Sequence, residues 1–130
     1  SQLKFEEFYR KKFIVVKDIE YREFGFGDLN EKIKKRHIAF KTNDEFNKFL
    51  REVVPMYVSK SLSYYEFPDA RPMEKKNWFG SDFAFDIDAD TSQCNHPKEF
   101  VCEKCMEKTK ESVLLVLDIL KNDLDFKDIE

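Results

Sequence analysis

Residues 81–90 read Ser-Asp-Phe-Ala-Phe-Asp-Ile-Asp-Ala-Asp, an alternation of apolar and acidic side chains. Because successive side chains of a strand point to opposite faces of its sheet, this period of two predicts a β-strand over residues 81–88. One face would consist of Phe83, Phe85 and Ile87, and the other of Asp82, Ala84, Asp86 and Asp88. Such a strand requires a sheet whose core covers the apolar face.

Asp86 and Asp88 are the most informative residues of this segment. On a strand their Cα atoms would lie about 6.5–7 Å apart, so converging carboxylates could hold two divalent ions about 4 Å apart. Neighbouring carboxylates repel unless a cation neutralises them, and their oxygen atoms suit Mg²⁺ or Mn²⁺. Paired ions of this kind support phosphoryl transfer. The alternative is a solvated acidic strand end, since two aspartates separated by one residue are common by chance.

Cys94, His96, Cys102 and Cys105 offer four soft or borderline metal ligands within twelve residues. Four protein ligands would close a tetrahedral Zn²⁺ site, so we expect a structural metal in an insertion spanning about residues 91–106. Free thiols beside a solvated histidine are one alternative. A redox Cys-x-x-Cys pair is another, although it would leave Cys94 and His96 without a role. The cluster favours a reducing compartment over a disulfide framework.

The composition indicates a folded protein. The chain has 130 residues, of which 38% are charged and 42% hydrophobic, with 14 Phe and 5 Tyr. We expect one domain over residues 1–130 with an aromatic-rich core. A net charge of −3 argues against a protein that holds nucleic acid alone through broad phosphate neutralisation. Without an apolar run of signal-peptide or bilayer type, we expect no membrane association and a cytoplasmic location.

The remaining patterns predict a mixture of helices and strands. Thr42 to Glu45 match the reciprocal capping pattern of a helix start, and apolar residues at helical spacing follow it. Further helices are expected near the N-terminus, from Phe5 to Phe13, and around residues 113–120. Strands are expected over residues 19–26, 37–41, 56–61 and 63–67. We therefore predict an α/β (α+β) fold, a mixed sheet with packed helices.

The order of these features resembles that of archaeal and eukaryotic-type DNA primase catalytic (small) subunits over almost the whole chain. The resemblance is carried by Tyr21 to Phe24, Arg36-His37, Met73 to Trp78, Gly80 to Asp82, Phe85 to Asp90 and the cysteine–histidine cluster. It implies a primase catalytic-module fold with a zinc-binding knob, corresponding to the N-terminal portion of such a subunit.

The resemblance implies roles for individual residues. Asp86 and Asp88 would bind the catalytic Mg²⁺ or Mn²⁺, and the cluster at 94–105 would bind structural Zn²⁺. Arg36 would lie near the nucleotide, and Lys76 is a further candidate nucleotide-binding residue. For both cations the alternative is that of a solvated residue without a role in binding, in the case of Arg36 at the end of a strand. His37 is expected in the core or on the strand surface, because the sequence identifies no partner acid nearby.

The implied activity is de novo primer synthesis, a nucleotidyl transfer from NTPs on a single-stranded DNA template. Family members continue into a triphosphate-binding turn and a third metal-binding aspartate, so we expect this chain alone to be inactive. The expected partners are a complementary C-terminal primase polypeptide, the primase large subunit, template and NTPs. Both a split gene product and an excised segment fit. A non-enzymatic zinc-stapled interaction module and a nuclease are the competing interpretations.

Overall fold

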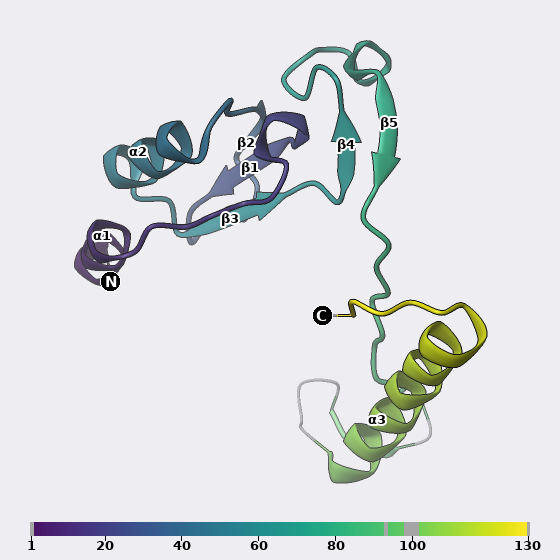
Figure 1. Cartoon of the computed structure of the whole chain (residues 1–130). Coiled ribbons are helices and arrows are strands. Elements are labelled where there is room, and N and C mark those ends of the chain that lie inside the picture. The colour runs from purple at the N-terminus through teal and green to yellow at the C-terminus, as the bar shows by residue number, and fades with distance from the viewer. Residues whose placement is uncertain (1, 93, 98–101, 130) are drawn as a thin grey trace. The chain divides into compact units, whose positions relative to one another are not determined.

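The computed structural model describes residues 2–92, 94–97 and 102–129. These form two compact units, Ser1–Ala84 and Phe85–Glu130. Helices and small sheets are mixed along the chain (Figure 1), which confirms the predicted α/β (α+β) class. The expectation of a single domain over residues 1–130 stays a prediction.

The first unit carries two small antiparallel sheets, so the predicted mixed sheet is wrong for the described strands, all of whose pairs are antiparallel. β1 (Phe24–Gly27) lies between β2 (Lys35–Ile38) and β3 (Tyr57–Lys60), and β4 (Ser63–Tyr65) pairs with β5 (Trp78–Ser81). The helices of this unit are α1 (Gln2–Lys11) and α2 (Asn43–Val53), with short 3₁₀ turns at Ile19–Tyr21 and Met73–Lys76. The strands expected over 56–61 and 63–67 are therefore confirmed with small changes of boundary.

The start of α2 follows from its local sequence. The Thr42 hydroxyl accepts a hydrogen bond from the Glu45 backbone N–H at 3.2 Å, and the Glu45 carboxylate accepts one from the Lys41 N–H at 2.9 Å. This is the predicted reciprocal cap, with the return bond displaced by one residue. Val54 adopts a left-handed conformation with φ 50° and ends the helix before Pro55.

Aromatic side chains dominate the core of the first unit, as expected. The ring centroids of Phe24 and Phe46 lie 4.8 Å apart, and those of Phe26 and Phe49 lie 4.7 Å apart. The buried cluster consists of Tyr9, Ile19, Phe24, Phe26, Phe40, Phe46 and Leu50. The Tyr9 hydroxyl donates to the Pro55 carbonyl at 2.8 Å, so α1 is tied to the chain that follows α2.

Two strand boundaries differ from the prediction. The strand expected from residue 19 begins only at Phe24, because Asp18 has φ 54° and the chain then forms a 3₁₀ turn. The strand expected over 37–41 lies at Lys35–Ile38, where Ile38 pairs with Phe24. Phe40 lies past the end of that strand and packs in the core instead.

In the second unit α3 (Glu103–Asp118) continues into a π-helical turn, η3 (Ile119–Asp123). The predicted final helix is therefore confirmed, and it begins earlier than its apolar residues alone indicated. Among the described residues, none of the helices is both long and apolar enough to cross a membrane.

The strand predicted over residues 81–88 is wrong. β5 ends at Ser81, and residues 82–90 have no regular secondary structure. The side chains of Phe83 and Phe85 are 66% and 55% exposed, so the expected apolar face is not covered. The physical reason is that a strand needs a neighbour for its backbone groups, and no described strand pairs with this segment.

Candidate functional site

The four predicted zinc ligands come together in the second unit. The ligand atoms of Cys94, His96, Cys102 and Cys105 all lie within 4.8 Å of one another. The Cys94 sulfur is 3.3 Å from that of Cys105 and 4.0 Å from that of Cys102, and His96 Nε2 is 3.4 Å from the Cys105 sulfur. Ligands around a tetrahedral zinc ion lie about 3.3–3.8 Å apart. The cluster therefore has the donor set and the spacing for one metal ion.

The start of α3 positions two of these ligands. Cys102 is the residue before the helix, and Cys105 lies buried in its first turn. The backbone N–H of Cys105 lowers the pKa of the Cys102 thiol from 9.0 to about 7. The thiol of Cys94 and burial raise the pKa of Cys105 to about 12. Residues 93 and 98–101 of the predicted insertion lie outside the described part of the chain.

Asp86 and Asp88 lie on the irregular segment after β5, and both are exposed. Among the described residues, the groups of three or more His, Cys, Asp or Glu that could hold a metal include neither. Their carboxylates suit Mg²⁺ or Mn²⁺ chemically, yet the described chain brings no third ligand to them. Their catalytic role stays a prediction. Asp90 differs, because its side chain accepts a hydrogen bond from the Ser92 N–H at 2.9 Å within a local turn.

Sequence reasoning missed a buried charged cluster around Glu23. One carboxylate oxygen of Glu23 lies 3.6 Å from Arg36 Nε and 3.4 Å from His37 Nδ1, and accepts the His37 backbone N–H at 3.1 Å. The other lies 3.4 Å from Lys76 Nζ. An acid therefore lies beside His37 and accepts its backbone N–H, while the ring Nδ1 makes no hydrogen bond to the described residues. The sequence could not identify this acid because it lies 14 residues away, just before β1. The available signal in the sequence was Glu23, a charged residue directly before the aromatic residues Phe24 and Phe26, because a charge beside an apolar segment needs a partner when it is buried.

The two candidate nucleotide-binding residues occupy different environments. Lys76 is 0% exposed; it donates to the Pro68 carbonyl, and its ammonium lies 5.5 Å from the centre of the Tyr65 ring. Arg36 is exposed, and its Nε faces Glu23. The nucleotide-binding role of each stays a prediction. In this structure Arg36 is open to solvent, whereas Lys76 is buried against Glu23, Tyr65 and Pro68.

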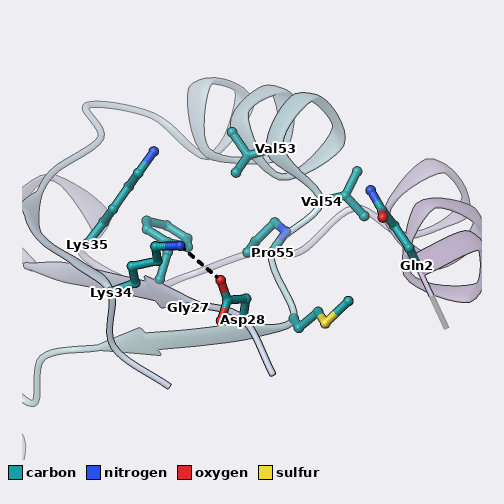
Figure 2. Close-up of a pocket in the computed structure, with 10 residues that line it drawn as sticks. Gln2, Gly27, Asp28, Lys34, Lys35, Val53, Val54 and Pro55 are labelled. Atoms are coloured by element: carbon teal, nitrogen blue, oxygen red, sulfur yellow. Dashed lines mark hydrogen bonds and ion pairs between the residues drawn. The ribbon is translucent and has the colours of Figure 1, made fainter. Parts of the chain in front are cut away.

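Two surface cavities flank the first sheet. One, of about 280 Å³, lies beside the Glu23 cluster and is lined by Glu23, Gly25, Ile33, Arg36, Ser59, Lys60, Ser61 and Tyr65. The other, of about 310 Å³, is drawn in Figure 2. Its apolar wall includes Val53, Val54 and Pro55, and at its edge Lys34 Nζ pairs with the Asp28 carboxylate at 3.2 Å. The second cavity contains none of the predicted site residues.

Comparison with known proteins gives consistent relatives. The chain is 36% identical over 132 residues to the DNA primase small subunit of Pyrobaculum arsenaticum, which covers 98% of this chain and 41% of that protein. It is 32% identical over 143 residues to that of Sulfurisphaera tokodaii, and the match covers 92% of this chain and 45% of that protein. It is 34% identical over 131 residues to the DNA primase small subunit of Methanosarcina acetivorans, and the match covers 98% of this chain and 31% of that protein.

These matches confirm the resemblance inferred from the motifs. The chain spans less than half the length of the curated relatives it matches. No family model matches the chain.

Proposed function

We propose that this chain, which resembles DNA primase small subunits over nearly its whole length, provides part of the active site of a primer-synthesising enzyme. In the proposed reaction a 3′-hydroxyl attacks a nucleoside triphosphate on a single-stranded DNA template, a phosphodiester bond forms and pyrophosphate leaves. The chain would correspond to the N-terminal portion of such a subunit. The supporting observation is a match to these subunits that spans 98% of the chain and so includes the Phe85 to Asp90 motif.

In this proposal Asp86 and Asp88 hold the catalytic Mg²⁺ or Mn²⁺. Such ions would help the hydroxyl to lose its proton and would stabilise the charge that develops on the transferred phosphoryl group. Exposure of both carboxylates supports the proposal, since a site for ions and a nucleotide has to be reached from solvent. Arg36 would contribute positive charge near the nucleotide, because its guanidinium is exposed while its Nε faces Glu23.

Completion of this site requires further polypeptide. β5 pairs with β4, and no described strand pairs with the other edge of β5. Trp78 and Phe79 on β5 are 65% and 58% exposed. They point to opposite faces of the sheet, and exposed apolar side chains on both sides of an unpaired strand edge mark that edge as a contact surface. We propose that the part of a primase subunit beyond the length matched here, the complementary polypeptide, covers this surface and gives residues 82–88 a neighbouring strand. This chain alone would then be inactive.

The cysteine–histidine cluster is proposed to bind structural Zn²⁺. Its four ligands would fill a tetrahedral coordination sphere and would leave no position for substrate or water. The remaining partners follow from the proposed function, namely the primase large subunit, single-stranded DNA and NTPs, with a cytoplasmic location. The net charge of −3 supports the proposal that another chain contributes to binding of the DNA template.

The test is template-directed incorporation of labelled NTPs on single-stranded DNA. We expect activity from this chain mixed with the complementary polypeptide in Mg²⁺ or Mn²⁺, and none from this chain alone. Asp86→Ala should remove the activity of the mixture, while the matched variant Asp90→Ala should retain it. Incorporation by the isolated chain would contradict the need for a second polypeptide, and an active Asp86→Ala mixture would contradict the metal site.

A non-enzymatic interaction module is the second candidate. It is favoured by one observation: the zinc ligands are assembled in the chain, whereas Asp86 and Asp88 belong to no cluster of three metal ligands among the described residues. A Mn²⁺ titration of the zinc-loaded mixture separates the two functions. A binding module has no Mn²⁺ site that depends on Asp86, and a primase does.

A further inference from the structure

Arg22 is almost completely buried, with 3% of its surface exposed. A guanidinium keeps its charge at all ordinary pH values, so its burial is costly unless every partner is well placed. Arg22 lies just before β1, next to Glu23, but it makes none of the described contacts of the Glu23 cluster. Its partners lie instead on three other parts of the first unit.

The guanidinium donates four hydrogen bonds. They run to Lys17 O at 2.8 Å, Ser61 O at 2.9 Å, Tyr64 Oη at 2.9 Å and Asp82 Oδ2 at 2.7 Å. The Tyr64 ring also packs against the guanidinium, 4.5 Å from its Cζ to the ring centre. A planar group held by so many separate segments has one available orientation. The position of the Arg22 side chain within the first unit is therefore fixed.

Asp82 is held from several directions at once. One carboxylate oxygen accepts from Arg22, and the other accepts a hydrogen bond from the Tyr64 hydroxyl. Its backbone N–H donates to Leu62 O at 2.8 Å. The bond from Arg22 keeps the pKa of the Asp82 carboxyl below its ordinary value, so the carboxylate is charged when it binds. Asp82 is the residue that follows β5, and it begins the segment that carries Asp86 and Asp88.

We propose that Arg22 is a positioning residue for the metal-binding carboxylates. Through Asp82 it fixes the start of the segment that carries Asp86 and Asp88, at a place where strand pairing ends. The inference rests on the proposed function. Lysine cannot replace Arg22, because a single ammonium group lacks the planar fork that reaches the Asp82 carboxylate, the Tyr64 hydroxyl and two carbonyls together. A shift of about 1 Å in a catalytic group can reduce a rate by about 10²-fold.

The experiment compares Arg22→Lys and Tyr64→Phe with Tyr9→Phe in the mixture with the complementary polypeptide. Tyr64→Phe keeps the ring beside Arg22 and removes the hydroxyl that binds Asp82. Tyr9→Phe removes a buried hydrogen bond to Pro55 and serves as the destabilised control. The readout is the Mn²⁺ concentration that gives half-maximal primer synthesis, measured beside Tm. Hydrogen exchange of the Asp82 amide in the chain alone reports the anchor directly.

We expect Arg22→Lys to raise the half-maximal Mn²⁺ concentration about tenfold or more, and Tyr64→Phe to raise it less. Both should speed exchange of the Asp82 amide. Tyr9→Phe should lower Tm and leave the Mn²⁺ requirement and this amide unchanged. If Arg22→Lys fails to fold, Tyr64→Phe alone decides.

An unchanged Mn²⁺ requirement and an unchanged Asp82 amide in the folded variants would overturn the inference. So would an equal rise of the Mn²⁺ requirement in Tyr9→Phe, because the effect would then follow stability alone. Asp86→Ala separates this failure from failure of the proposed function. An active Asp86→Ala mixture rejects the proposed metal site on which the inference rests, whereas an inactive one with a normal Arg22→Lys rejects only the positioning role.

Discussion

The cysteine–histidine cluster and the aspartate segment are both predicted metal sites, and the structure treats them differently. The cluster brings four ligand atoms within 4.8 Å of one another inside a stretch of twelve residues. The aspartate segment forms no strand, and Asp86 and Asp88 belong to no described group of three metal ligands. The first site is complete within its own stretch of chain, and the second is not.

The difference follows from what each site requires. A Cys-x-x-Cys pair at a helix start places two thiols on one turn, so local geometry suffices for Cys102 and Cys105. A strand obtains its regular geometry from hydrogen bonds to other strands, which local sequence cannot supply. The segment of Asp86 and Asp88 therefore depends on distant chain, whereas the zinc ligands depend on each other.

The largest expected effect separates the two sites by function. Asp88→Ala should reduce primer synthesis by the reconstituted mixture roughly 10³-fold or more, because phosphoryl transfer relies on charge stabilisation at the reacting group. Its zinc content should equal that of the unmodified chain. Primer synthesis is measured with labelled NTPs and zinc by elemental analysis. Loss of zinc in this variant would show that the two sites are not independent.

Removal of one zinc ligand should reduce zinc binding, which Asp88→Ala should leave unchanged. Cys105→Ser is expected to lower zinc affinity by at least about 100-fold and to loosen the chain around residues 94–105, because metal binding and local folding are coupled. Hydrogen exchange of the first turn of α3 measures the loosening. The core around Phe46 should keep its protection, since it lies in the other compact unit. A Cys105→Ser chain with full zinc content would contradict the four-ligand site.

Acid should weaken the anchor of the aspartate segment. The bond from Arg22 lowers the pKa of Asp82, so the stability that this pair contributes is present above the ordinary carboxyl pKa and is lost as pH falls through the lowered value. Urea unfolding of the unmodified chain and of Asp82→Asn, compared at pH 6 and at pH 3, measures this contribution. The difference between the two chains should shrink in acid. A constant difference would mean that the carboxylate charge at Asp82 is irrelevant.

The smallest expected effect concerns the N-terminal cap of α2, which, like the cysteine–histidine cluster, is formed by residues close together in sequence. Thr42→Ala removes the hydroxyl that accepts the Glu45 N–H and should lower the free energy of unfolding by about 1 kcal/mol. Thr42→Ser, which keeps a hydroxyl, is the matched control and should cost less. Urea denaturation measures both. Equal losses in the two variants would place the effect in the methyl group instead of the cap.

The same division explains what could be predicted from sequence. The helix cap at Thr42, the final helix and the grouping of the four zinc ligands each depend on neighbours in sequence, and each was found. The burial of Arg22 and of Lys76 was not, because their acidic partners lie 60 and 53 residues away, at Asp82 and Glu23. An alternating pattern such as that of residues 81–88 predicts a strand but does not tell which chain pairs with it.

The most direct measurement is a calorimetric titration with Mn²⁺. The sample is the zinc-loaded mixture of this chain with the complementary polypeptide. The central claim is that Asp86 and Asp88 bind catalytic cations once the segment has its neighbours. We predict weak binding by the chain alone, tighter binding by the mixture, and a loss of affinity of about tenfold or more in Asp86→Asn. Equal Mn²⁺ affinity in the unmodified and Asp86→Asn mixtures would contradict the claim.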